Sequence, residues 1–424
     1  MRRVFFGVCI CLSLAGCTGK KSSPTGDPLG EYLVIDIASG IGEYQKAYCS
    51  DFFSSMELIT LETNKKSLIG DEPVVLLHDQ LIFIHSITLS SVFPPIRDLY
   101  VFDRSGKFLN QIGKTGNGPG EYRSIDNVFL NRDKPAIYIE DNNHILEYEL
   151  DGTFIRSFRV PKVDGENLFR CSYAGNNLFV GQVSYNGKNK YKYCLFDQDG
   201  NIVKGFPSYF FYEKVGKGWS YTSALNPVWV DDHLYLKDYV NDTLYTLTDS
   251  ELHPAYIFDF GKYSIPIEKL SHDIPAGSSN NIVISGMVGT PDYIFYHLYV
   301  PEILSRPKSR PILMSSGRER STDAIVYGIY HIKRNANIFL DTDPYQQKGL
   351  INDINGGLSF IPQYYAGNGV LIDFWKAEDM KEMLTEEYFA TQKTKDRQAH
   401  QQLRELLKKM KDEDNGVIVV AKLK

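Results

Sequence analysis

Short segments in which apolar and polar residues alternate occur along most of the chain, and this pattern predicts an all-β protein. Three of these segments share one design: an aromatic strand end, a turn that ends in Gly, and a second apolar strand. The three copies lie at 102–108, 148–154 and 196–202. Because Gly adopts the positive φ that a tight turn between strands requires, each copy predicts a β-hairpin.

The spacing of these hairpins indicates how they are arranged. The turn residues Gly106, Gly152 and Gly200 are 46 and 48 residues apart, and weaker copies follow at 244–258 and 326–340. A period of roughly 40 to 50 residues with several short strands is typical of β-propeller blades. Laid over the chain to its last residue, this period predicts a six-bladed β-propeller. A β-sandwich is the alternative, but its repeats would be less regular in length.

Each end of the repeat region contains a strand that lacks a partner in its own repeat. One is at 57–62 and the other, at the C-terminus, is at 417–423. Pairing them in one blade would close the ring and remove two exposed strand edges. We therefore predict that the sixth blade takes its outermost strand from the N-terminal side.

Residues 377–414 depart from the strand pattern. They contain no Pro or Gly and place Leu403, Leu407 and Met410 at helical spacing. The segment predicts a short helical insert in the last blade, with two helices between its second and third strands. This position puts the insert on the same face of the ring as the long loops. It is either a lid or docking arm, or a segment that simply packs on the propeller.

The N-terminal residues have the pattern of an export signal. Arg2 and Arg3 precede a short apolar run at 4–14, and two small residues follow it before Cys17. The run is too short to cross a bilayer, which needs about 20 apolar residues. The pattern resembles the lipobox of bacterial lipoproteins, in which the cysteine is lipidated and becomes the mature N-terminus. An ordinary cleaved signal with a chance cysteine is the alternative.

The lipobox resemblance implies an organisation for the whole chain. Residues 1–16 form a lipoprotein signal peptide, Cys17 carries the lipid, residues 17–31 form a flexible polar tether, and residues 32–424 form the propeller. Several acyl chains on one cysteine hold a protein on a membrane without a spanning segment. Thr18 after the cysteine, rather than Asp, favours the outer membrane and leaves the leaflet open. We predict a lipid-anchored protein of the cell envelope.

Composition and cysteine count restrict the functional classes. A net charge of -6 argues against nucleic-acid binding, and 43% hydrophobic residues suit a large core. After export and lipidation Cys49, Cys171 and Cys194 remain, and this odd number excludes a fully paired disulfide framework. Cys171 and Cys194 either pair in the oxidising periplasm or stay as buried thiols.

Residues 103–158 resemble NHL-type repeats. The resemblance rests on the stretch GKTGNGPGEY at 113–122 and on the pair Asp141-Asn142 after a strand. The whole mature chain is similar to six-bladed β-propeller lipoproteins of unknown function that are common in carbohydrate-degrading gut bacteria. This resemblance implies the fold but not the function. The stretch at 113–122 lacks the spacing of a phosphate-binding loop and is interpreted as a connection between blades.

The candidate ligand-binding residues lie in the long connections, which a propeller of this topology gathers on one face around the central channel. Aromatic rings cover the apolar faces of sugars, and Arg side chains bind hydroxyls or carboxylates. The same aromatic residues would also serve to pack the loops onto the blades. The candidates are Arg97, Tyr122, Arg123, Asp141, Asn142, His144, Trp219, Tyr221, Arg318 and Arg320.

Motifs for catalysis and for cofactors are missing from the sequence. It contains no His-x-His, no Glu-x-x-His and no Gly-x-Ser-x-Gly, so neither a metal ion nor another cofactor is predicted. Asp141 and its neighbours also suit a turn in which Asx side chains bind the backbone. The leading hypothesis is a non-enzymatic binding or scaffold lipoprotein for a glycan or an envelope protein. The alternative is a propeller hydrolase or lyase with a channel-centred site, with or without a metal ion.

Overall fold

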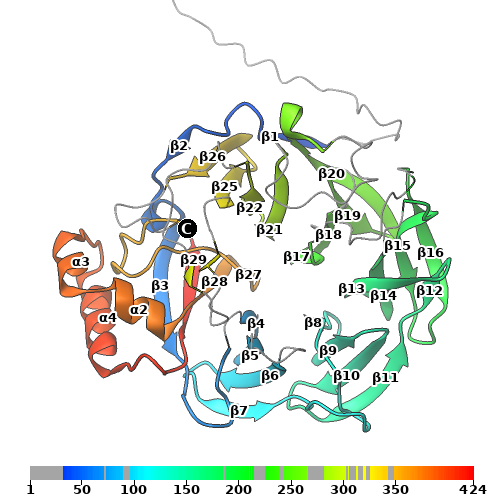
Figure 1. Ribbon diagram of the computed structural model, residues 1–424, viewed down its shortest axis with the longest axis horizontal. Coiled ribbons are helices and arrows are strands. Elements are labelled where there is room, and N and C mark those ends of the chain that lie inside the picture. The colour runs from blue at the N-terminus through cyan, green and yellow to red at the C-terminus, as the bar shows by residue number, and fades with distance from the viewer. Residues whose placement is uncertain are drawn as a thin grey trace, which may run out of the picture.

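The computed structural model of the chain describes residues 32–70, 73–88, 96–184, 187–209, 211, 213, 225–237, 242–265, 281–301, 304, 312–313, 319–320, 325–341 and 348–424. Six sheets stand around a central axis as the blades of a β-propeller, with a few short helices near the C-terminus (Figure 1). The predicted fold class is therefore confirmed. The resemblance to NHL-type repeats in particular stays a prediction.

Blades one to three are antiparallel sheets whose strands follow one another in the chain. Blade one contains β4 (Val74–His78), β5 (Leu81–Thr88), β6 (Ile96–Asp103) and β7 (Phe108–Gln111). Blade two contains β8 (Asn127–Leu130), β9 (Ala136–Asp141), β10 (His144–Glu149) and β11 (Phe154–Arg159). Blade three contains β13 (Glu166–Gly175), β14 (Leu178–Val183), β15 (Tyr191–Phe196) and β16 (Ile202–Pro207), and β12 (Lys162–Val163) pairs with β13.

Blades four and five each receive a fifth strand from the N-terminal segment. Blade four contains β17 (Val228–Val230), β18 (His233–Lys237), β19 (Thr243–Thr248), β20 (Glu251–Asp259) and β1 (Leu33–Asp36). Blade five contains β21 (Val283–Gly289), β22 (Tyr293–Tyr299), β25 (Ile325–His331), β26 (Ala336–Leu340) and β2 (Tyr44–Gln45). Between β22 and β25 lies the hairpin of β23 (Ile312–Leu313) and β24 (Glu319–Arg320), and η1 (Gly261–Tyr263) follows blade four.

Blade six closes the ring with strands from both ends of the chain. It contains β27 (Tyr364–Tyr365), β28 (Val370–Trp375), β29 (Val417–Leu423) and β3 (Phe53–Thr60). β29 pairs with β3 in antiparallel register from Val417 opposite Thr60 to Leu423 opposite Phe53. The predicted closure by an N-terminal outermost strand is confirmed.

The N-terminal segment also runs along the outside of two further blades before it reaches blade six. β1 pairs in parallel with β20, and β2 pairs in parallel with β26. In Figure 1 this segment is the blue trace that passes outside β20, β25 and β26 and continues into β3. Ile35 and Ile37 are fully buried against blades four and five. These two fifth strands were not predicted, and they cover the outer edges of their blades.

The helical insert lies between β28 and β29, as predicted, but it contains three helices rather than two. They are α2 (Ala377–Met383), α3 (Glu386–Thr391) and α4 (Arg397–Lys409). Thr385 and Asp396 accept hydrogen bonds from backbone N–H groups at the starts of α3 and α4, which fixes where these helices begin. Leu403 and Leu407 of α4 pack into a core shared with blade six. A fourth short helix, α1 (Cys49–Phe52), precedes β3.

The three turn glycines have the left-handed backbone conformation that the sequence predicts. Gly106, Gly152 and Gly200 have φ of 83°, 91° and 80°, as their hairpin turns require. The stretch at 113–122 joins β7 to β8, as interpreted from the sequence. Cys49, Cys171 and Cys194 are all buried free thiols. Among the described residues, no helix is both long and apolar enough to cross a membrane.

Candidate functional site

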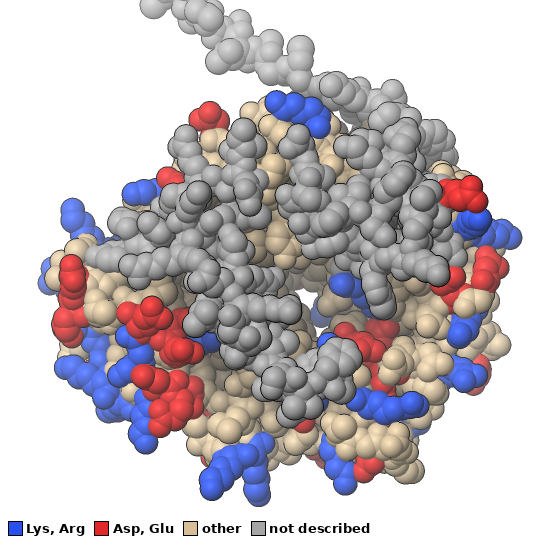
Figure 2. Space-filling view, viewed as in Figure 1, with Lys and Arg blue, Asp and Glu red and all other residues tan. Residues whose placement is uncertain are grey.

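Polar side chains from four consecutive blades meet at the mouth of the central channel, on the face of the long connections. Figure 2 looks down the ring axis and shows basic and acidic side chains beside the central opening. We call the following set the mouth cluster: Arg97, Asp126, Asn127, Glu140, Arg170 and Asn226.

Arg170 has an unusual backbone conformation in the innermost strand of blade three. Its φ is 51°, in the left-handed region that costs a residue other than Gly of order 1 kcal/mol or more. The pairing of β13 with β14 skips from Phe169 to Ser172, so Arg170 lies in a β-bulge. Bulges redirect side chains, and strained residues are concentrated at functional sites.

Two side chains of blade two hold this bulge in place. The carboxyl group of Glu140 accepts a hydrogen bond from the backbone N–H of Cys171 at 2.9 Å. The amide Nδ2 of Asn127 donates to the carbonyl oxygen of Cys171 at 2.8 Å. Both backbone groups of Cys171 therefore find partners on blade two instead of on β14. This accounts for the interrupted pairing beside Arg170.

The guanidinium group of Arg170 faces both neighbouring blades. Its Nη1 donates to Oδ1 of Asn226 at 3.3 Å, and Asn226 lies just before the innermost strand of blade four. The charge of Glu140 in blade two also acts on it. A side chain on the innermost strand that reaches both neighbours lies on the channel side of the ring. Burial lowers the pKa of Arg170 below its ordinary value, which shows that water solvates this charge incompletely.

Glu140 and Cys171 are the most deeply buried reactive groups of this region. Glu140 is 1% exposed, and burial raises the pKa of its carboxyl group to about 7. Burial, followed by the nearby charge of Glu140, raises the pKa of the Cys171 thiol well above its usual value. A thiol in this state is unreactive. Both groups therefore position the bulge and do not reach the channel surface.

Arg97 supplies a second guanidinium group, from β6 of blade one. Its Nη1 donates to the carbonyl oxygen of Ile125 and lies 3.6 Å from Oδ1 of Asp126. Its Nε is buried and has no hydrogen-bond partner among the described residues. Beside it, burial and then the charge of Arg97 lower the pKa of His85 to about 4, so this imidazole is neutral at pH 7.

Two aspartates anchor the loops that surround the cluster. Asp141 accepts hydrogen bonds from the backbone N–H groups of Arg123 at 2.9 Å and Ser124 at 3.3 Å. The backbone N–H of Asn142, whose φ is 54°, donates to Oδ2 of Asp126 at 2.8 Å. Asp141 thus binds backbone N–H groups, but those of a neighbouring loop rather than of its own turn, and the side chain of Asn142 donates to Asp141 at 2.9 Å.

The other residues singled out from the sequence are distributed unevenly. Tyr122 is fully buried in the core of blades one and two, where no ligand reaches it. Arg123 is exposed at the rim, and His144 begins β10 opposite Asp141. Arg320 is described only as a backbone position in β24. Cys17, Trp219, Tyr221 and Arg318 lie outside the described residues.

Five residues of the mouth cluster were missed, because the predicted site was placed in the longest connections. Glu140 and Arg170 lie within strands, Asn127 begins one, and Asp126 and Asn226 lie just before one. A single charged residue inside a strand segment, as in LFRCSY at 168–173, is a signal that could have identified Arg170. Within the described part of the chain, no three His, Cys, Asp or Glu side chains are grouped so that they could hold a metal ion.

Comparison with known families and structures agrees with this architecture. Residues 32–422 match the family model described as a domain of unknown function, DUF4934. The chain belongs to the DUF4934 family. No curated protein matches it.

A solved structure similar to this DUF4934 chain has the same fold. A Bacteroides fragilis protein described as exported is 17% identical, with a TM-score of 0.66 over 92% of this chain and 99% of that one. A member of the DUF4221 family from Bacteroides vulgatus is 10% identical, with a TM-score of 0.48 over 88% of this chain and 97% of that one. At these identities the first match speaks for the fold alone.

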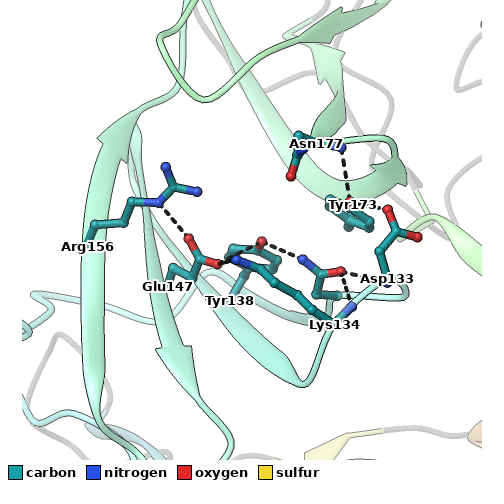
Figure 3. A network of polar contacts seen from close by, with 8 residues as sticks. Asp133, Lys134, Tyr138, Glu147, Arg156, Tyr173 and Asn177 are labelled. Atoms are coloured by element: carbon teal, nitrogen blue, oxygen red, sulfur yellow. Dashed lines mark hydrogen bonds and ion pairs between the residues drawn. The ribbon is translucent and has the colours of Figure 1, made fainter.

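The DUF4934 chain has a second polar network in blade two (Figure 3). Glu147 has a side chain that is 0% exposed and accepts hydrogen bonds from Lys134 Nζ and Arg156 Nε, each at 2.6 Å. We call Lys134, Glu147 and Arg156 the blade-two clamp. Burial by itself would raise the pKa of Glu147, but the bonds from its two cations leave that pKa below the usual value. The hydroxyl of Tyr138 also donates to Glu147, at 3.3 Å.

The clamp continues into the interface with blade three. Tyr138 stacks on Tyr173 with ring centroids 6.2 Å apart, and the hydroxyl of Tyr173 donates to Asp133 at 2.5 Å. The backbone N–H of Asn177 donates to the Tyr173 hydroxyl at 3.0 Å. Asp133 and Lys134 lie in the turn between β8 and β9, and Asn177 lies in the turn between β13 and β14. Both turns connect the first strand of a blade to its second, so this network lies at the opposite end of the blades from the mouth cluster. Each polar group in this network has a partner, which is typical of a structural element.

Proposed function

We propose that this protein is a lipid-anchored binding protein of the cell envelope. It presents the long-connection face of a rigid ring to a ligand at the mouth of the channel, and a glycan is the ligand that this proposal favours. The predicted signal peptide and lipobox support export and anchoring through Cys17 to the outer membrane. The similarity of the fold to a Bacteroides protein described as exported agrees with the proposed export.

The observation that carries the proposal is the strained, channel-facing Arg170. A propeller core that needed only to fold would place an apolar residue or Gly at a buried bulge with a positive φ. This chain instead keeps a partly desolvated guanidinium there and uses Glu140 and Asn127 to hold the bulge. Arrangements that cost stability and direct a polar group to a concave opening are characteristic of binding sites.

Binding fits the mouth cluster better than hydrolysis or elimination. A general acid or base must come within hydrogen-bond distance of the substrate. Glu140, whose pKa of about 7 suits proton transfer, is 1% exposed and is occupied by the backbone of Cys171. Cys171 is fully buried. Glu140 and Cys171 therefore support the position of Arg170 rather than chemistry on a ligand.

The binding function is tested with the purified mature protein on an array of bacterial and plant polysaccharides. In parallel, cross-linking in intact envelopes would recover a bound protein partner. We expect specific glycan retention that falls at least tenfold in Arg170→Gln. The control is Arg397→Gln, which removes an equal charge from an exposed position of α4 and should leave retention unchanged. Glycan retention that is unchanged in Arg170→Gln, or the absence of both a retained glycan and a cross-linked protein partner, would contradict the proposal.

The proposed anchor is tested by Cys17→Ala. Removing the acylated thiol leaves the propeller without its acyl chains, so we expect the protein to move from the membrane fraction to the soluble fraction. Metabolic labelling with palmitate measures the modification directly. Palmitate incorporation and membrane recovery that survive the substitution would refute lipidation at this position.

A further inference from the structure

We propose that the mouth cluster recognises a carboxylate on a carbohydrate, that is, a uronic acid residue of an acidic glycan, with Arg170 as its principal contact. This inference rests on the proposed binding function and adds the chemical class of the ligand. It follows from the guanidinium of Arg170, which forms no ion pair among the described residues, and from the neutral and acidic groups beside it.

Arg170 has no ion-paired counter-charge in the part of the chain that the structure describes. Among the described residues, no carboxylate forms an ion pair with it, and its hydrogen bond goes to the neutral amide of Asn226. Glu140, the acid whose charge acts on it, is held by the backbone N–H of Cys171. A partly buried guanidinium is most stable with a planar anion that accepts two parallel hydrogen bonds. The N–H groups of the Arg170 guanidinium that have no partner among the described residues therefore suit a carboxylate.

The surrounding acids limit the charge that the site accepts. Asp126 is 43% exposed and lies beside Arg97, and Glu140 lies beside Arg170. A second negative charge on the ligand, as in a phosphate monoester, would be repelled by these carboxyl groups, whereas a single negative charge matches Arg170, the guanidinium of the pair that forms no ion pair among the described residues. This charge count favours a carboxylate over a phosphate.

The neutral and acidic neighbours favour a sugar acid over an acidic peptide. A uronic acid carries hydroxyl groups next to its carboxylate, and each hydroxyl both donates and accepts hydrogen bonds. The amide of Asn226 beside Arg170 and the exposed carboxylate of Asp126 beside Arg97 provide partners of this kind. An aspartate or glutamate side chain would occupy Arg170 but leave these groups unused.

The test measures binding of tri-galacturonate to the full mature protein by calorimetry. The matched probes are its methyl ester, which keeps the hydroxyls and removes the charge, a hexaglutamate peptide, and inorganic phosphate. We expect the acid to bind at least tenfold more tightly than each of the other three. An ester that binds equally well, or a peptide or phosphate that binds more tightly, would overturn the uronate assignment.

Two variants of Arg170 separate binding from folding. Arg170→Gln removes the charge and should weaken tri-galacturonate binding at least tenfold, while Arg397→Gln should leave it unchanged. Arg170→Gly should lose the same binding without a lower melting temperature, because Gly adopts φ of 51° without strain. Full binding by either Arg170 variant would refute the assignment.

The outcome for the general function is read separately from the polysaccharide array. If another glycan binds through Arg170 while tri-galacturonate does not, the binding function stands and the uronate assignment is wrong. If no ligand depends on Arg170, both proposals are wrong.

Discussion

Blade two contains two buried glutamates whose surroundings differ in every respect that matters for function. Glu147 is enclosed by Lys134 and Arg156, each 2.6 Å away, and its pKa lies below the usual value. Glu140 accepts a hydrogen bond from a backbone N–H, and burial raises its pKa to about 7. Glu147 forms ion pairs with both cations at one end of the blade, whereas Glu140 supports the strained Arg170 at the other end.

The two glutamates show how architecture can be separated from function in a chain whose sequence has no catalytic motif. The blade-two clamp has a partner for each charge, so it contributes to folding and needs nothing further. The mouth cluster leaves Arg170 without an ion pair and Arg97 Nε without a hydrogen-bond partner among the described residues. A charged group without a partner on a rigid, concave surface is available to bind a ligand.

The largest expected effect is on the clamp. Glu147→Gln removes the negative charge between two cations and should lower the free energy of unfolding by about 2 kcal/mol at pH 7. This figure is reduced because Lys134 and Arg156 are 45% and 39% exposed, so water partly screens them. Urea denaturation measures the change. Glu149→Gln, an exposed site on the same strand, is the control and should shift stability by less than about 0.5 kcal/mol.

The clamp also predicts the direction of the pH dependence. The pKa of Glu147 is lowered by folding, so its contribution is present above the unfolded pKa and is lost as pH falls through the folded one. The difference between wild type and Glu147→Gln should therefore shrink at pH values below about 4. A difference that stays constant across that range would show that the pair contributes packing rather than charge.

Glu140→Gln is the same substitution with the opposite expected sign. Folding raises the pKa of Glu140 to about 7, so its contribution is present below the unfolded value and is lost as pH rises through 7. The neutral amide should therefore increase the free energy of unfolding by about 1 to 2 kcal/mol at pH 8 and by little at pH 5. Urea titrations at the two pH values measure this. A variant that is destabilised at pH 8 would mean that the carboxylate is needed for its charge.

The sequence predicted the parts of the fold that depend on local rules. The hairpin spacing works because Gly106, Gly152 and Gly200 each provide the positive φ of a turn. The closing pair of β3 and β29 could be inferred because two unpaired strands at the ends of the chain needed partners. The fifth strands β1 and β2 could not, because four and two residues of alternating pattern do not specify which blade edge they pair with.

The site was harder to predict because its key feature is not local. The bulge at Arg170 depends on Glu140 and Asn127, which bind Cys171 from 31 and 44 residues away. The sequence of β13, ENLFRCSYAG, does not reveal this, because nothing in it shows which residues of blade two bind Cys171. Arg97 and Asp141 were found because loop ends attract polar residues. Only the structure shows that Asp141 anchors a loop, whereas Arg97 lies beside Asp126 and has a buried Nε without a partner among the described residues.

The smallest expected effect is the most direct test of strain in the mouth cluster. Arg170→Gly relieves the positive φ and should increase the free energy of unfolding by about 0.5 to 1 kcal/mol, because Gly populates this region freely. The greater flexibility of Gly in the unfolded chain offsets part of the gain, which is why the figure is small. Arg170→Ala is the control, because it removes the same guanidinium but keeps the strain. If Ala is as stable as Gly, the backbone at Arg170 is not strained, and the guanidinium alone distinguishes the mouth cluster from the clamp.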